Sequence, residues 1–131
     1  MSGAIIPYGK QLVDEEDRKA VLDVLLSSHL TQGEQIGLFE KAICELTGAR
    51  YCVAVSSGTA ALHVAVLATG HKAGKGLTSA NTFVASSNSL IFAGLEPELI
   101  DIELSTFNMD IDKLVERVDE NVKVVIPVHF A

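Results

Sequence analysis

The sequence of 131 residues contains only two cysteines, no long hydrophobic run and no cluster of basic residues. Cys44 and Cys52 are too few for a disulfide scaffold and lack the paired spacing of a metal site, so both are expected to face a core. No apolar run reaches the roughly 18 to 20 residues that a membrane span needs. The first residues show no basic segment followed by an apolar one, so no secretory signal is predicted. These absences favour a cytoplasmic protein.

Acidic residues outnumber basic ones by 17 to 10, which gives a net charge of −7. With no Lys/Arg cluster, this balance argues against nucleic acid as the main partner, but it leaves room for a small anionic ligand in a local pocket of donors. Hydrophobic residues make up 48% of the chain, which is enough for a core and too much for a disordered segment. The length suits one ordinary domain or one piece of a larger one.

Two amphipathic helices are predicted in the first fifty residues. Asp14 precedes three acidic residues, 15–17, as an N-cap precedes an acidic first turn, and apolar residues then recur at helical spacing up to Leu25. A loop at 30–33 follows. The second helix carries its apolar face at Ile36, Phe39, Ile43 and Leu46. Gly48 is expected to end it.

Short apolar runs at 51–55, 99–102 and 122–126 predict buried strands. Helices are expected between them, because 59–68 is a stretch of small apolar residues and 83–92 ends before a glycine. The alternation predicts an α/β fold, a mostly parallel sheet flanked by helices.

The helix over 59–68 is expected to be well buried, and Gly70, Gly74 and Gly76 are expected to mark the loop that follows it. A further helix is expected to begin at Asp110 or Asp112, before the last strand. That strand should be central in the sheet, and the sequence stops directly after it. The chain is therefore expected to be an incomplete part of a larger domain.

The strongest local signal is the run Val53-Ala54-Val55-Ser56-Ser57-Gly58-Thr59-Ala60. A strand leading into a helix through these residues places free amides at the helix N-terminus, where the dipole favours a phosphate. Ser57 and Thr59 can add hydroxyl hydrogen bonds, and Gly58 lets a ligand approach the backbone. The alternative is an ordinary turn with Ser/Thr caps. The run lacks the patterns of a dinucleotide site, a P-loop or a hydrolase nucleophile elbow.

A second polar loop, residues 78–88, carries one aromatic side chain, Phe83, which could lie against a flat ligand. The alternative is that Phe83 is a core residue that anchors the next helix. The histidines, at positions 29, 63, 71 and 129, show no metal-ligand spacing and are expected to be structural or solvated. Asp101 could face a site, but it is expected to cap the turn at Ser105-Thr106.

Several motifs occur together in a characteristic order. They are Ile6-Pro7-Tyr8-Gly9-Lys10, Asp14 to Asp17, Leu30-Thr31-Gln32-Gly33, Phe39-Glu40, Ser56-Ser57-Gly58-Thr59-Ala60-Ala61-Leu62-His63, Thr82-Phe83-Val84-Ala85, Asp101-Ile102-Glu103, Asn108-Met109-Asp110 and Ile126-Pro127-Val128-His129. With them the sequence resembles the DegT/DnrJ/EryC1/StrS family of sugar-nucleotide aminotransferases, which depend on pyridoxal phosphate (PLP). It looks most like the branch that aminates C4 of UDP-linked 4-keto-6-deoxy sugars, as in the pseudaminic acid and spore-coat polysaccharide enzymes.

The resemblance implies a fold and roles for particular residues. The chain would be the N-terminal part of the fold-type I aminotransferase large domain, with residues 1–33 forming an N-terminal helix and substrate-contacting segment and 34–131 the first part of the PLP-binding domain. The cofactor-binding residues would be Ser57, Gly58, Thr59, Ala60 and Phe83, with Phe83 stacked on the pyridine ring. The substrate-binding residues would be Tyr8, Leu30, Thr31, Gln32 and Gly33.

The resemblance also shows what this chain does not contain. The family's Schiff-base lysine, and the carboxylate that holds the pyridine nitrogen protonated, lie beyond Ala131. None of the seven lysines here matches the lysine motif, so no catalytic residue is assigned to this chain. There is also a local departure, because Ala73-Gly74-Lys75-Gly76-Leu77-Thr78 stands where the family usually has Gly-Asp-Glu-Val-Ile-Thr.

The implied activity is transfer of an amino group from glutamate to a nucleotide-linked keto-deoxy sugar, in bacterial surface-polysaccharide biosynthesis, by a homodimer. Two alternatives remain open at this stage. One is a non-catalytic binding or regulatory protein of the same fold, and the other is an inactive truncated remnant. The residue at the lysine position distinguishes the first alternative from the enzyme.

Overall fold

The computed structural model describes residues 9–130. The chain divides into two compact units, Met1–Val53 and Ala54–Ala131, and each is described by itself. Tyr8, which the sequence assigned to the substrate, lies outside the described residues.

The first unit contains helices α1 (Glu15–Leu25) and α2 (Glu34–Thr47). Asp14 caps α1 as predicted: its Oδ1 accepts the Asp17 N–H at 3.0 Å, and Asp17 Oδ2 accepts the Asp14 N–H at 3.0 Å. Gly48 ends α2 in the left-handed conformation, with φ of 72°, also as predicted. Neither helix buries a residue, so their apolar faces lie open in this unit.

The prediction of a buried strand over 51–55 is wrong. The structure forms no strand over these residues, and Tyr51 and Val53 are 80% and 69% exposed. An apolar run can suggest a strand, but only a hydrogen-bonded neighbour makes one.

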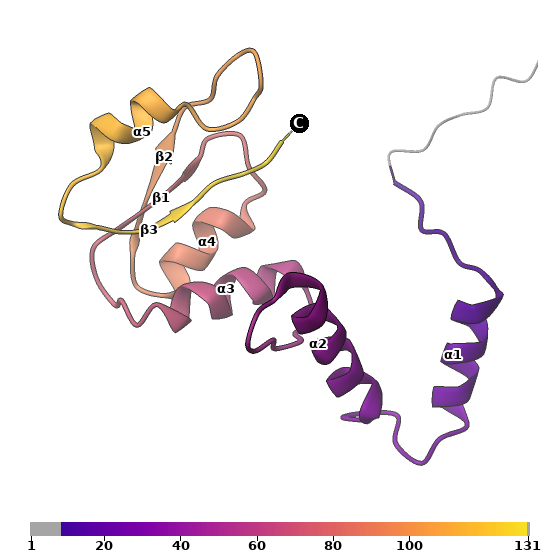
Figure 1. Cartoon of the computed structure of the whole chain (residues 1–131). Coiled ribbons are helices and arrows are strands. Elements are labelled where there is room, and N and C mark those ends of the chain that lie inside the picture. The colour runs from indigo at the N-terminus through magenta and orange to yellow at the C-terminus, as the bar shows by residue number, and fades with distance from the viewer. Residues whose placement is uncertain (1–8, 131) are drawn as a thin grey trace, which may run out of the picture. The chain divides into compact units, whose positions relative to one another are not determined.

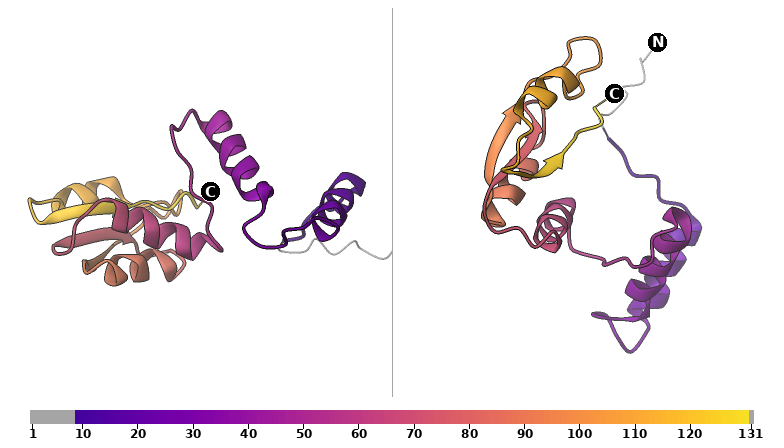
Figure 2. Two further views of the ribbon diagram at one scale, coloured as in Figure 1. Left: turned by 90° about the horizontal axis from the view of Figure 1, so that it is seen from below. Right: turned by 60° about the vertical axis from the view of Figure 1, so that its left-hand side comes forward.

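The second unit is an α/β arrangement, as predicted (Figures 1 and 2). Its elements are α3 (Gly58–Ala68), β1 (Lys75–Ser79), α4 (Ala85–Phe92), β2 (Glu96–Ile100), α5 (Ile111–Arg117) and β3 (Val122–Ile126). The three strands are parallel and lie in the order β2-β1-β3. β3 has the predicted bounds, whereas β2 begins three residues before the predicted start. Asp110 caps α5, which settles the choice between Asp110 and Asp112.

Helices cover both faces of this small sheet. On one face Val66 of α3 and Leu90 of α4 pack with Leu95, against Val124 and Ile126 of β3. On the other face a cluster joins the sheet to α5, and its members are Leu77, Ile100 and Met109, with Leu114 and Val122 packed against them. α3 is less buried than predicted, because only Val66 of its side chains is enclosed in this unit.

The unusual sequence at the start of β1 forms a regular strand. Gly76, predicted in a loop, lies inside β1, at a shift of register against β3 between Lys75 and Gly76. A Cβ at Gly76 would lie 2.3 Å from Leu90 Cδ2, so α4 packs directly onto the backbone here. Gly74 has φ of 109°, and a Cβ there would lie 2.7 Å from the Asn121 carbonyl oxygen. Glycine is therefore required at both positions, because a side chain at either one would collide with a neighbouring atom.

Candidate cofactor-binding site

The start of α3, residues 57–60, is the segment proposed from the sequence as an anion cradle. Ser57 is the N-cap in extended conformation, and its Oγ accepts the Ala60 N–H at 3.2 Å. The first backbone bond of the helix runs from Ala61 N–H to the Ser57 carbonyl at 3.0 Å. The amides of Gly58 and Thr59 precede that bond and have no acceptor within the helix, so they are available to a ligand.

The cradle has room and charge suited to a phosphate. Ser57, Gly58 and Thr59 are exposed, and a Cβ on Gly58 would meet no atom within 4 Å. The first turn of α3 holds no acidic residue, whereas α1 and α2 each begin with one or more. The positive end of the helix dipole is therefore not neutralised by the helix's own side chains. These residues fit the phosphate group of PLP.

The cradle lies at the carboxyl edge of the sheet. A short connection joins the end of α3 to the start of β1, so α3 runs back along the sheet and its N-terminus lies at the edge where the strands end (Figure 1). In open α/β sheets this edge is where ligands bind. The structure thus brings Ser57, Gly58, Thr59 and Ala60 together at the ligand-binding edge of the second unit.

Phe83 stands at the same edge, in the loop that follows β1. Phe83 is 73% exposed, so it is not part of the core of this unit. Its backbone is held, since the Phe83 carbonyl accepts the Ser86 N–H at 3.0 Å and the hydroxyls of Thr82 and Ser86 lie 2.8 Å apart. An exposed ring on a fixed backbone can serve as a platform for a flat ligand.

The expected substrate loop, 30–33, belongs to the first unit. Gln32 has a left-handed backbone, with φ of 55°, and Gly33 is the N-cap of α2. Leu30, Gln32 and Gly33 line an open cavity of about 300 Å³ together with residues from α1 and from the start of α2. Thr31 is exposed beside them.

Asp101 was predicted to cap the turn at Ser105-Thr106, and this prediction is wrong. Its Oδ2 accepts a hydrogen bond of 2.7 Å from Lys113 Nζ, and its Oδ1 accepts the Ile102 N–H. The hydrogen bond from Lys113 lowers the pKa of the Asp101 carboxyl, and the same contact raises the pKa of Lys113. Glu103 takes the role in the turn instead, because its Oε2 accepts the Thr106 hydroxyl at 3.0 Å.

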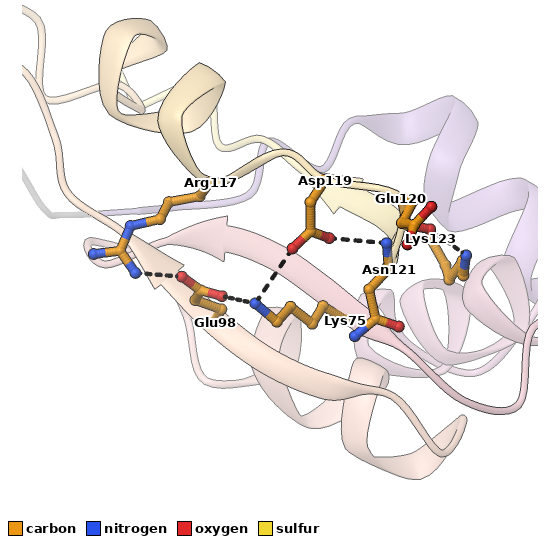
Figure 3. Close-up of polar contacts among 7 residues, drawn as sticks. All are labelled: Lys75, Glu98, Arg117, Asp119, Glu120, Asn121 and Lys123. Carbon is orange, nitrogen blue, oxygen red and sulfur yellow. Dashed lines mark hydrogen bonds and ion pairs between the residues drawn. The ribbon is translucent and has the colours of Figure 1, made fainter.

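An ionic cluster at the opposite, amino edge of the sheet was not predicted (Figure 3). Lys75 Nζ lies 3.2 Å from Glu98 Oε2 and 3.8 Å from Asp119 Oδ2, and Arg117 donates to Glu98 Oε1 at 2.6 Å. The hydrogen bond from Lys75, followed by that from Arg117, lowers the pKa of Glu98. The sequence did contain a signal for this cluster, because Lys75 stands where the family usually has an acidic residue.

Within residues 9–130 no group of three His, Cys, Asp or Glu side chains is placed to hold a metal ion. His63 is structural, with its ring 5.4 Å from that of Phe92. Cys44 and Cys52 are free and half-buried rather than enclosed in a core. The described helices include none long and apolar enough to cross a membrane.

Solved structures with this fold include sugar aminotransferases. PseC of Helicobacter pylori, an aminotransferase of pseudaminic acid biosynthesis, superposes with a TM-score of 0.84 and 32% identity, over 95% of this chain and 34% of its own. Spr1654 of Streptococcus pneumoniae, solved in its PLP form, has a TM-score of 0.84 and 29% identity, over 92% of this chain and 31% of its own. The likeness confirms the predicted fold, the first part of an aminotransferase large domain.

Similar sequences agree with the structures. The spore coat polysaccharide biosynthesis protein SpsC of Bacillus subtilis is 38% identical over 126 residues, 95% of this chain and 32% of SpsC. The UDP-4-amino-4-deoxy-L-arabinose–oxoglutarate aminotransferase of Shewanella sediminis is 33% identical over all of this chain and 34% of its own length. The chain thus spans about a third of the curated relatives that it matches. Residues 11–131 match the DegT/DnrJ/EryC1/StrS aminotransferase family, and the chain belongs to that family.

Proposed function

We propose that this chain is the N-terminal part of a PLP-dependent aminotransferase that transfers an amino group from glutamate to a nucleotide-linked keto-deoxy sugar in bacterial surface-polysaccharide biosynthesis. The observation that carries the proposal is the cradle at the start of α3, with the exposed Phe83 at the same sheet edge, in a chain of this family. The names of the two relatives support the polysaccharide context and the oxoglutarate co-product of glutamate.

Four of the five proposed cofactor-binding residues have a distinct task, whereas the Ala60 N–H is bonded to Ser57 Oγ. The amides of Gly58 and Thr59 donate to phosphate oxygens, and the Thr59 hydroxyl adds a further donor. Ser57 Oγ accepts the Ala60 N–H, which leaves the Ser57 hydroxyl hydrogen available to the phosphate. Phe83 stacks on one face of the pyridine ring. When bound, the cofactor supplies the electron sink on which amino-group transfer depends.

The substrate residues are assigned to the first unit. We assign Tyr8 and the loop Leu30, Thr31, Gln32 and Gly33 to the sugar nucleotide, and residues 1–33 to a substrate-contacting segment that precedes the PLP-binding part, 34–131. The catalytic lysine is not among the seven lysines of this chain. The proposed protein is a cytoplasmic homodimer.

The cofactor site is tested by titrating the chain with PLP and following the amide resonances of Gly58 and Thr59. We expect Thr59→Glu to abolish the shifts, because a carboxylate in the first turn repels phosphate while it favours the helix. Gln35→Glu adds the same charge to the first turn of α2 and should bind as the native chain does. Shifts that survive in Thr59→Glu would place the phosphate elsewhere.

The catalytic part of the proposal is tested by reading the coding sequence beyond the codon for Ala131. An acidic residue soon after the Pro-Val-His segment and a later Ser-x-x-Lys-like motif would support an aminotransferase. Another residue at the lysine position would exclude transamination and favour a non-catalytic member of the family.

A further inference from the structure

The loop between β2 and α5, residues 101–110, is tied into a compact excursion. Ile102 and Met109 form an antiparallel bridge, the Glu103 N–H donates to the Asn108 carbonyl at 3.0 Å, and the Asp110 N–H donates to the Asp101 carbonyl at 3.0 Å. So many cross-links within ten residues make the excursion a fixed structure rather than a loose connection.

The tip of this excursion reaches the chain that leaves β3. Asn108 Oδ1 accepts the Phe130 N–H at 2.8 Å, a hydrogen bond between residues 22 apart in sequence. The rings of Phe107 and Phe130 lie 5.9 Å apart at 52°. Phe107 adopts a left-handed backbone, with φ of 58°, which non-glycine residues rarely take. We call this double contact the edge latch.

The edge latch crosses the end of the central strand. β2 and β3 flank β1, so a contact between the segments that follow them has to pass over the carboxyl end of β1 (Figure 1). Ser79, the last residue of β1, is completely buried, and its Oγ has no hydrogen-bond partner among the described residues. Met109 is 4% exposed. Met109 anchors the excursion to the sheet, because it packs with Leu77 and Ile100.

Two segments leave the carboxyl edge of the sheet from neighbouring strands. The loop with Phe83 follows β1, and residues 127–130 follow the adjacent strand, β3. Residues 127–130 are therefore the segment next to the Phe83 loop on the β3 side. The phosphate contacts at the start of α3 do not involve this segment.

On the basis of the proposed function, we propose that Asn108 is a positioning residue: by holding the Phe130 N–H it fixes residues 127–130 as the wall that confines the PLP ring beside Phe83. The latch acts on the ring and not on the phosphate. Removing it should therefore weaken the binding of PLP and leave the binding of inorganic phosphate at the cradle unchanged.

The test compares three variants of the chain, each titrated with PLP and with inorganic phosphate. Asn108→Ala should bind PLP about five-fold more weakly, the order expected for one lost hydrogen bond, and should bind phosphate as before. Asn108→Asp keeps an oxygen that can accept the Phe130 N–H and should bind PLP as the native chain does. Asn121→Ala, the same truncation at the amino edge of the sheet, should bind both ligands normally.

Hydrogen exchange at the Phe130 amide reports the latch itself and should accelerate only in Asn108→Ala. Equal binding of PLP by the native chain and Asn108→Ala would overturn the role of the latch while the proposed function stands. Parallel weakening of PLP and phosphate would show general destabilisation and would also overturn it. Failure of the native chain to bind either ligand would reject the proposed cofactor site, and the role of the latch with it.

Discussion

Leu90 of α4 fills the space beside Gly76 of β1. Enlarging residue 76 and shortening residue 90, singly and together, tests how this face of the sheet is packed. A Cβ at Gly76 would lie 2.3 Å from Leu90 Cδ2 and 2.7 Å from Leu90 Cδ1. Leu90 is completely buried, so it has no free direction in which to move. By the resemblance, the family usually has valine at the position of Gly76, so valine is the replacement to test.

Each single substitution should be costly, for opposite reasons. Gly76→Val overpacks the interface and should lower the free energy of unfolding by about 3 kcal/mol, which is the upper part of the usual range because the clash involves a buried side chain. Leu90→Ala leaves a cavity and should also cost about 3 kcal/mol. In the double variant the valine side chain enters the cavity, so the total loss should be about 4 kcal/mol rather than 6.

Urea denaturation followed by far-ultraviolet circular dichroism measures these free energies, provided that one transition with an unchanged slope is seen in all four proteins. The coupling of about 2 kcal/mol is the quantity of interest. Strict additivity of the two losses would refute the shared-space argument, and so would a Gly76→Val variant as stable as the native chain.

Three further predictions use the same assay. Glu98→Gln should lower stability at neutral pH. Lys75 and Arg117 lower the pKa of Glu98, so the Glu98 carboxylate stabilises the fold fully above the ordinary glutamate pKa of about 4.3. This stabilisation is lost as the pH falls through the lowered pKa. A difference from the native chain that does not shrink in acid would contradict this. Ser57→Ala removes the N-cap of α3 and should cost about 1 kcal/mol, and an unchanged midpoint would show that the cap is dispensable. Gly37→Ala lies inside α2, where the added Cβ meets no atom within 4 Å, and should stabilise by about 0.5–1 kcal/mol; a lower midpoint would indicate a contact that the structure does not show.

Helix ends could be predicted because their signals are local. The carboxylate of Asp14 reaches amides two and three residues away, and Gly48 takes a backbone conformation that few other residues tolerate. The Ser57 cap and the helix start at Gly58, where the phosphate site is proposed, could be predicted for the same reason, since a cap depends only on neighbouring residues. Phe83 was located as a candidate, but its exposure required the structure.

Pairing between distant segments could not be predicted from the same signals. The run 51–55 has the composition of a strand and forms none. Gly76 was predicted in a loop, but it lies in the central strand because β1 pairs with β2 on one side and with β3 on the other. The partners of Lys75 likewise come from other elements, β2 and the segment before β3.

The sequence by itself determined the α/β class and the positions of the helix caps, including the Ser57 cap where the phosphate site is proposed, because these depend on periodicity and on contacts within a few residues. Only the tertiary structure decided which strands are adjacent, which side chain packs against the backbone of Gly76, and that Asn108 accepts the hydrogen bond of the Phe130 amide. Those features arise where segments far apart in the chain meet, and each depends on the shape and hydrogen-bonding groups of both partners at once.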